Sequence, residues 1–203
     1  SGNTVEQTMG GGICQVSTTL YQALLHAELD IVERHQHSML VSYAEPSMDA
    51  AIADDVMDLV FKNNQEYPVY IESVVGGGSI TFNIYGKETR DPNRIVTYVS
   101  ETLSSEQATG TNYVASDDPI GYINYVSAAH PKISAQLWKI VTENGEEVSR
   151  EVVNQSEYVS SPETYSVGTA SDDANATAKM QQAIGTQDLA TINAAIQEII
   201  YGY

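Results

Sequence analysis

The chain has 203 residues, of which 42% are hydrophobic and 18% charged, so it can form a packed core and is not a disordered protein. Its 27 aspartates and glutamates against 9 lysines and arginines give a net charge of −18, which argues against nucleic-acid partners. One cysteine excludes an internal disulfide and a multi-cysteine zinc site. The sequence contains neither a membrane-spanning apolar run nor a signal peptide, so we expect any export signal or anchor to lie outside it.

The first predicted element is a helix over residues 15 to 29, which begins directly after the segment GGGIC. Glycines such as Gly11 and Gly12 let the backbone approach a ligand and leave the first helical N–H groups unblocked. The positive end of the helix dipole favours the thiolate of Cys14, which is the nucleophilic form. This placement predicts a reactive cysteine, although a lone buried and inert thiol is the more common case.

Strands come after the helix. DIVERHQHSMLVSY (residues 30 to 43) predicts one strand, and residues 46 to 55 predict a loop. VMDLVFKN (56 to 63) alternates as a strand does. YPVYIESVV and SITFNIYG, joined by the glycines at 76 to 78, predict a hairpin.

The charged segment KETRDPNR (87 to 94) predicts a domain boundary. We therefore expect an α+β N-terminal domain over residues 1–90, with the Cys14 helix on an antiparallel sheet. Short strand-like runs predict a small all-β domain over residues 95–169. Residues 170–203 predict a linker and a C-terminal helix, roughly 176 to 201, which Gly185 would divide.

A nucleophilic cysteine needs a base or an imidazolium nearby. Glu33, His35 and His37 would share one face of the strand predicted over residues 30 to 43. Either histidine is a candidate base, with His37 preferred because the apolar run after Ser38 places it deeper in the sheet. The alternative is that one histidine belongs to the core and the other to the surface.

Other polar residues allow further interpretations. The pair His35 and His37 could hold zinc with a third ligand, although the spacing selects none; the possible third ligands are His26, Cys14, Asp49, Asp54, Asp55 and Asp58. Ser17 and Thr18 share the helix face of Cys14 and could bind a substrate carbonyl or each other. The backbone N–H groups of the first turn could stabilise an oxyanion.

Three segments together resemble the VanW domain of Gram-positive cell-envelope proteins: GGGICQVSTTLYQALL, IVERHQHSMLVSY and DLVFKNNQEYPVYIES. The resemblance covers roughly residues 9 to 86. Family members usually carry about thirty further residues before the glycines, and they read Gly-Arg-Asp-Ala where this chain has Ser47, Met48, Asp49 and Ala50. If that arginine binds a substrate carboxylate, binding here is in doubt.

Residues 95 to 168 resemble a G-five wall-associated domain, through the closing segment LWKIVTENGEEVSREVVNQSEYVSSPETYSVG. Such modules are extended β units that act as spacers or contact wall sugars. The two resemblances imply a protein at the extracellular face of the cell envelope, in contact with the membrane only through a segment outside this sequence. The family name derives from a vancomycin-resistance gene cluster, which does not assign resistance to this chain.

The resemblance also implies a reaction. Some VanW domains are cysteine L,D-transpeptidases, which attack a tetrapeptide stem of peptidoglycan and pass the acyl group to an amine. Carried over, the nucleophile is Cys14 and the base is His37 or His35. Predicted substrate contacts are Gly11, Gly12, Gln15, Ser17, Thr18 and Asp49. The partners are stem peptides and glycan, with no metal or other cofactor. The alternative is a non-catalytic peptidoglycan-binding or scaffolding protein.

Overall fold

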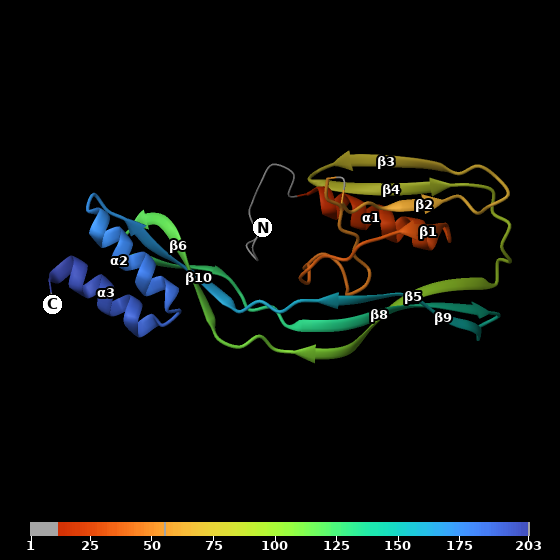
Figure 1. Ribbon diagram of the computed structural model, residues 1–203. Helices are drawn as coiled ribbons and strands as arrows, with labels where there is room; N and C mark the ends of the chain where they lie inside the picture. Colours follow the sequence, from red (N-terminus) through yellow and green to blue (C-terminus); the bar gives the residue numbers. More distant parts are fainter. Residues whose placement is uncertain (1–11, 55, 203) are drawn as a thin grey trace. The chain divides into compact units, whose positions relative to one another are not determined.

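The computed structural model describes residues 12–54 and 56–202 (Figure 1). Two compact units are built from interleaved segments of the chain. Unit 1 comprises residues 1–105 and 132–159, and unit 2 comprises residues 106–131 and 160–203. This division differs from the predicted one: residues 95–169 contribute strands to both units, and residues 87–94 lie within unit 1.

Unit 1 contains one helix and seven strands among the described residues. In chain order these elements are α1 (Ile13–His26), β1 (Asp30–Glu33), β2 (Val60–Lys62), β3 (Tyr70–Gly76), β4 (Ser79–Tyr85), β5 (Arg94–Glu106), β8 (Lys132–Glu143) and β9 (Glu146–Tyr158). The strands form two antiparallel pairs, β1–β2 and β3–β4, and a three-stranded sheet in the order β5–β8–β9. Helix α1 contacts β4 and β1.

The predicted hairpin is confirmed, because β3 and β4 pair from Tyr70–Tyr85 to Gly76–Ser79. Gly77 and Gly78 both have positive φ, at 60° and 79°, as a tight hairpin turn requires. The strand predicted over residues 30 to 43 is wrong beyond Glu33, where β1 ends. Residues 34 to 43 are irregular apart from one isolated bridge between His35 and Ala51.

The predicted helix is present, but the face that it buries contains polar as well as apolar residues. Its buried residues are Ser17, Thr18, Tyr21, Leu24 and Leu25. Val16, which the apolar spacing placed toward the core, is 36% exposed. Tyr21 and Leu25 share a buried cluster with Ala50 and Leu137, so α1 packs against residues of both the loop and β8.

Just beyond the end of α1 lies Glu28, a residue whose left-handed conformation (φ 55°) is held by an ionic cluster. Its carboxylate, 11% exposed, pairs with Arg94 at 2.5 Å, Lys139 at 2.9 Å and Arg90 at 3.2 Å. The hydrogen bond from Arg94, aided by Lys139 and Arg90, lowers the pKa of Glu28 from 4.5 to about 2. The segment predicted as a domain boundary is therefore fixed to the end of α1.

We predict that this cluster makes unit 1 acid-sensitive. A carboxyl whose pKa is lowered on folding contributes stability above its ordinary pKa and loses it as the pH falls toward the folded value. Glu28→Gln should lower the free energy of unfolding by about 1–3 kcal/mol at pH 7. Urea titrations should show the difference between wild type and variant disappearing between about pH 4.5 and pH 2. A difference that stays constant over this range would contradict the role of Glu28.

Unit 2 contains a three-stranded sheet and two helices. These are β6 (Thr111–Pro119), β7 (Ile123–Ser127), β10 (Glu163–Ala170), α2 (Ala174–Gly185) and α3 (Leu189–Tyr201). Strand β10 lies in the centre, parallel to β6 and antiparallel to β7. Its Val167 packs with Met180 of α2 and Ile192 of α3 in one buried cluster.

The predicted C-terminal helix is two helices, divided after Gly185. Asp173 and Asp188 cap their N-termini, each accepting a backbone N–H through its carboxylate. Between the helices Gln187 has φ 56°, and its side-chain amide pairs with both backbone groups of Tyr113. In the described part of the chain, no helix is long and apolar enough to cross a membrane.

Gly168 is the position at which unit 2 requires glycine. A Cβ there would lie 2.1 Å from the carbonyl oxygen of Pro119 and 2.6 Å from that of Asp118. Because both are backbone atoms, β6 and β10 would have to separate. We expect Gly168→Ala to destabilise unit 2 by about 3 kcal/mol or more in thermal unfolding. Gly185→Ala, where a Cβ meets nothing within 4 Å, is the matched control and should not destabilise. Equal melting of the two variants would refute this prediction.

Candidate functional site

Cys14 is the second residue of α1 and is partly exposed. Its thiol donates a hydrogen bond to the carbonyl oxygen of Ile52, with Sγ 3.4 Å from that oxygen. Gly12, at the N-cap, has no side chain with which to cap the N–H groups of the first turn. The sulfur therefore lies at the positive end of α1, as predicted.

The backbone from Asp49 to Ile52 is bonded along the first turns of α1. Ser17 donates to the carbonyl oxygen of Ala50 at 2.6 Å, and Thr18 both donates to that oxygen and accepts from the Ala50 N–H. Both hydroxyls are buried, with residue exposures of 6% and 2%. Ser17 and Thr18 thus attach the loop to the helix, and they are not placed to contact a substrate as predicted.

Asp49 is 1% exposed and accepts four hydrogen bonds through its carboxylate. Its Oδ2 accepts from the backbone N–H and the Nδ1 of His37, both at 2.7 Å. Its Oδ1 accepts from Arg34 at 2.7 Å and from the Tyr158 hydroxyl at 2.5 Å. Burial alone would raise the pKa of Asp49, but the bonds from His37 and Tyr158 and the charge of Arg34 hold it below its usual value. The carboxylate of Asp49, predicted to contact substrate, is thus buried and orients His37.

His37 faces Tyr43 with its other nitrogen. The Tyr43 hydroxyl lies 3.2 Å from Nε2, and the two rings meet edge to face. Because the carboxylate of Asp49 can only accept, Nδ1 carries the proton and Nε2 is the basic atom. Burial raises the pKa of Tyr43, and the nearby Cys14 acts in the same direction. Tyr43 is thus in contact with the imidazole, and the charge of Cys14 also influences its pKa.

The two candidate histidines have different partners. His35 pairs through Nε2 with Glu33 at 2.9 Å, and both side chains are substantially exposed, at 39% and 44%. His37 is 17% exposed and bound to Asp49. Among the described residues, neither imidazole is hydrogen-bonded directly to Cys14, whose thiol is bonded to Ile52. The structure assigns the oriented imidazole to His37, the preferred candidate.

The remaining predicted residues lie at the start of α1. Gln15 is exposed, as is Gly12, where an added Cβ would meet nothing within 4 Å. The fold therefore does not require glycine at residue 12, and a ligand has room to approach its backbone. Gly11 and the possible zinc ligand Asp55 lie outside the described residues. The described residues contain no group of three or more His, Cys, Asp or Glu side chains that could hold a metal ion.

The sequence did not identify Arg34, Tyr43, Ser156 or Tyr158 as members of this site. Arg34 and Tyr43 lie in the segment that contains the histidines, but no periodic pattern marks them, because that segment is irregular. Ser156 and Tyr158 lie more than a hundred residues from Asp49 along the chain. Only the tertiary structure brings them to it.

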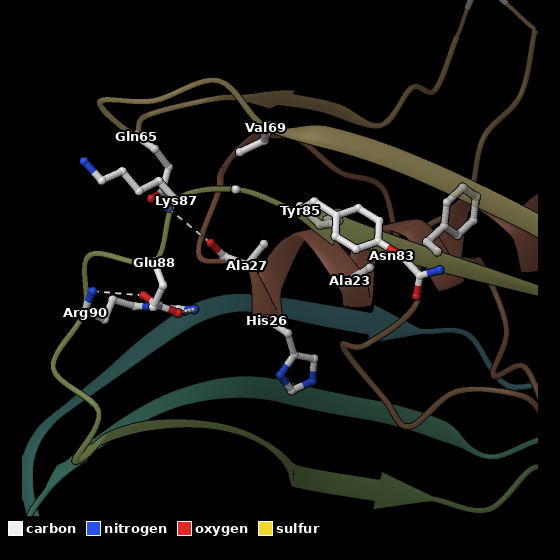
Figure 2. A pocket seen from close by; sticks show the side chains of 13 residues that line it. Ala23, His26, Ala27, Gln65, Val69, Asn83, Tyr85, Lys87, Glu88 and Arg90 are labelled. Carbon is white, nitrogen blue, oxygen red and sulfur yellow. Dashed lines mark hydrogen bonds and ion pairs between the residues drawn. The ribbon is translucent and has the colours of Figure 1, made fainter.

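Several cavities open on unit 1, and two of them lie at opposite ends of α1. A groove of about 450 Å³ lies along the C-terminal half of α1 and is lined by Ala23 and His26 of this helix and by Asn83 and Tyr85 of β4 (Figure 2). Neither Cys14 nor His37 lines it. A second cavity, of about 470 Å³, includes Ile13 and Ile52, the neighbour and the hydrogen-bond partner of Cys14. This cavity is lined by residues next to the thiol in the sequence and in its hydrogen bond, and not by Cys14 itself.

The N-terminal segment of the chain is similar to a known protein family. Residues 1–85 match the family model described as VanW like protein. The uncharacterized protein YoaR of Bacillus subtilis (strain 168) is 37% identical over 84 residues, which cover 41% of this chain. They span 28% of the length of YoaR.

Two solved structures are similar to part of the chain. The IgA1 protease G5 domain has 22% identity and a TM-score of 0.22, covering 38% of this chain and 94% of its own. The HP0197-G5 structure has 10% identity and a TM-score of 0.18, covering 37% of this chain and 95% of its own. Both are G5 domains, but at these TM-scores they carry no conclusion about function. Residues 1–85, which contain Cys14, His37 and Asp49, are thus similar to the VanW family over less than half of the chain.

Proposed function

We propose that this chain is a cysteine acyl-transfer enzyme of the cell envelope, acting on peptidoglycan as an L,D-transpeptidase. Similarity to the VanW family supports the cell-envelope setting. The chemistry is supported by one observation above all: a buried Asp49 orients His37, whose free nitrogen faces Tyr43, and Cys14 is bonded to the same loop. A nucleophile, a base and a carboxylate that orients the base are the three parts of a catalytic triad.

The first half-reaction uses the thiol. The S–H turns from Ile52 toward Tyr43 and His37, and its proton passes to Nε2 of His37. The sulfur attacks the carbonyl carbon between the third and fourth residues of a stem peptide. Backbone N–H groups at the start of α1 stabilise the oxyanion. The C–N bond then breaks, the departing D-alanine amine takes the proton from His37, and a thioester to Cys14 remains.

The second half-reaction forms the crosslink. The amine of an acceptor stem attacks the thioester carbonyl and loses a proton to Nε2 of His37. The C–S bond breaks, the thiolate leaves and recovers the proton, and a new amide joins the two stems. Asp49 stays ionised throughout and stabilises the imidazolium that forms in each half. None of these steps requires a cofactor.

The two histidines provide a matched test. The full chain would be incubated with disaccharide-tetrapeptides, and released D-alanine and crosslinked dimers would be measured by mass spectrometry. His37→Ala should reduce the rate about 10²- to 10⁴-fold, the usual contribution of a general base. His35→Ala, which removes an exposed partner of Glu33, should change it little. Equal losses from both variants, or a larger loss from His35→Ala, would remove His37 from the role of base.

The alternative is a non-catalytic peptidoglycan-binding or scaffolding protein. In that case the thiol would serve only to bond Ile52 and fix α1 to its loop. Binding of the same disaccharide-tetrapeptides without D-alanine release, and unchanged in Cys14→Ala, would establish this alternative.

A further inference from the structure

Three alternate residues of β9 face the loop that carries Asp49. Asn154, Ser156 and Tyr158 lie two residues apart, so their side chains project from the same face of the strand. All three bond to Ser47: Asn154 Nδ2 to its carbonyl oxygen at 3.2 Å, Ser156 Oγ to its hydroxyl at 3.0 Å, and the Tyr158 oxygen to its N–H at 2.7 Å. Strand β9 lies outside residues 1–85, the segment that matches the family.

Ser47 needs this support because its backbone is strained. It is fully buried and has φ 66°, a left-handed conformation that favours glycine. The three bonds from β9 hold a serine in that conformation two residues before Asp49. The strand thereby fixes the direction in which the loop enters the site.

The same face of β9 also reaches the charged groups of the site. The Tyr158 hydroxyl, on a residue that is 1% exposed, donates to Oδ1 of Asp49 at 2.5 Å while it accepts from Ser47. Arg34 donates to Ser156 Oγ at 2.8 Å through one nitrogen and to Asp49 Oδ1 at 2.7 Å through another. Two of the four hydrogen bonds to the Asp49 carboxylate therefore come from Tyr158 itself and from a guanidinium that β9 bonds directly.

We propose that β9 completes the catalytic site: Tyr158, assisted by Ser156, is a positioning residue that fixes the Asp49 carboxylate and, through it, the orientation of His37. The effect of Tyr158 on catalysis rests on the proposed function. The effect of Tyr158 on the orientation of His37 does not depend on it. Residues 132–159 are thus part of the machinery of unit 1, in contrast to the spacer or wall-binding role that the sequence resemblance implies for residues 95–168. A VanW segment without β9 would lack the fixed carboxylate.

Tyr158→Phe tests the proposal, because it removes only the hydroxyl. Nuclear magnetic resonance of the full chain would follow the exchangeable Nδ1 proton of His37, which in wild type lies in a 2.7 Å bond to Asp49. We expect this resonance to shift or to be lost by exchange in the variant. Tyr98→Phe is the matched control, since it too removes only a tyrosine hydroxyl from unit 1, one that donates to the backbone carbonyl of Leu25 and does not touch Asp49. It should leave the resonance unchanged.

A rescue separates positioning from general stability. Ser47→Gly relieves the left-handed strain, so the double variant Tyr158→Phe with Ser47→Gly should regain much of the melting temperature that Tyr158→Phe loses. The His37 resonance should stay displaced in the double variant, because the bond to Asp49 is still missing. Should Tyr158→Phe fail to fold alone, the comparison is made between Ser47→Gly and the double variant. An unchanged His37 resonance in a folded Tyr158 variant would overturn the proposal.

Turnover, if the proposed function holds, gives a second readout. Tyr158→Phe should lower kcat about 10- to 100-fold with little change in KM, the usual effect of removing a group that orients a catalytic residue. The pH–rate profile should also differ from that of wild type, because the Asp49 carboxylate has lost one of its four hydrogen-bond donors. If the His37 resonance is displaced in Tyr158→Phe but the wild-type chain has no transpeptidase activity, β9 remains the positioning element. Only the proposed transpeptidase reaction is then rejected. A wild-type pH profile and kcat in a folded, active Tyr158 variant would reject the positioning role alone.

Discussion

We expect Cys14→Ala to abolish D-alanine release and dimer formation from disaccharide-tetrapeptides, a loss of about 10³-fold or more. The reason is that in the proposed reaction the thioester forms on Cys14, whereas the hydroxyls of Ser17 and Thr18 are buried and bonded to Ala50. Cys14→Ser should be nearly as inactive, because a serine hydroxyl at this position is far less nucleophilic than a thiolate. Both products are measured by chromatography and mass spectrometry.

The matched control for these variants is Val16→Ala. Val16 lies on the same helix, is 36% exposed and has no polar group to contribute. It should retain the wild-type rate. Product formation by Cys14→Ala at a rate comparable with that of Val16→Ala would show that the thiol is not the nucleophile.

We expect Asp49→Asn to lower both the rate of the proposed reaction and the stability of the fold. An amide in place of the carboxylate favours the wrong tautomer of His37 and no longer stabilises the imidazolium, and such a change costs about 10³- to 10⁴-fold in kcat. It also leaves the buried guanidinium of Arg34, 6% exposed, without its counter-charge. The expected loss in the free energy of unfolding is about 3–5 kcal/mol. Steady-state kinetics and urea titration measure the two effects.

The loss of stability in Asp49→Asn should depend on pH in one direction. Because the pKa of Asp49 lies below its ordinary 3.8, its contribution to stability is complete above that value and is lost only as the pH falls below it. The difference between wild type and Asp49→Asn should therefore persist at pH 5 and narrow under strongly acidic conditions. Asp30→Asn, an exposed change on β1, should have little effect on kcat or stability. Similar losses from both variants would contradict the role assigned to Asp49.

The sequence predicted those parts of the fold that depend on residues close together in the chain. Gly77 and Gly78 supply the positive φ angles of the hairpin turn, so that hairpin was predictable from two residues. The helix after Gly12 was predictable from its periodicity, and the position of Cys14 at its start came with it. The break in the C-terminal helix likewise results from Gly185 and the cap at Asp188.

The prediction failed where long-range contacts decide the structure. The segment after Glu33 is rich in apolar residues and was predicted as a strand. In the fold it leaves β1 so that Arg34 and His37 can both bond Asp49. Ser17 and Thr18 are polar, and the sequence predicted that they contact substrate. In the fold both hydroxyls are buried, and each is satisfied by a hydrogen bond to the carbonyl oxygen of Ala50.

The division into units could not be predicted for a related reason. Strand β9 has the composition of an independent β module, and nothing local indicates that its alternate side chains contact Ser47 and Asp49. The bond between Arg34 and Ser156 joins residues 122 positions apart. Pairings at such separations depend on how the chain returns to unit 1 after residue 131, which local patterns do not encode.

The central claim is that Cys14 carries the acyl group, and intact-protein mass spectrometry tests it most directly. The full chain would be mixed with disaccharide-tetrapeptide in the absence of an acceptor amine, quenched in acid, digested and mapped. A thioester on Cys14 with the mass of the disaccharide-tripeptide, absent from Cys14→Ala and released by added acceptor amine, is the predicted result. Unmodified Cys14 in a folded chain that binds the same disaccharide-tetrapeptide would contradict it.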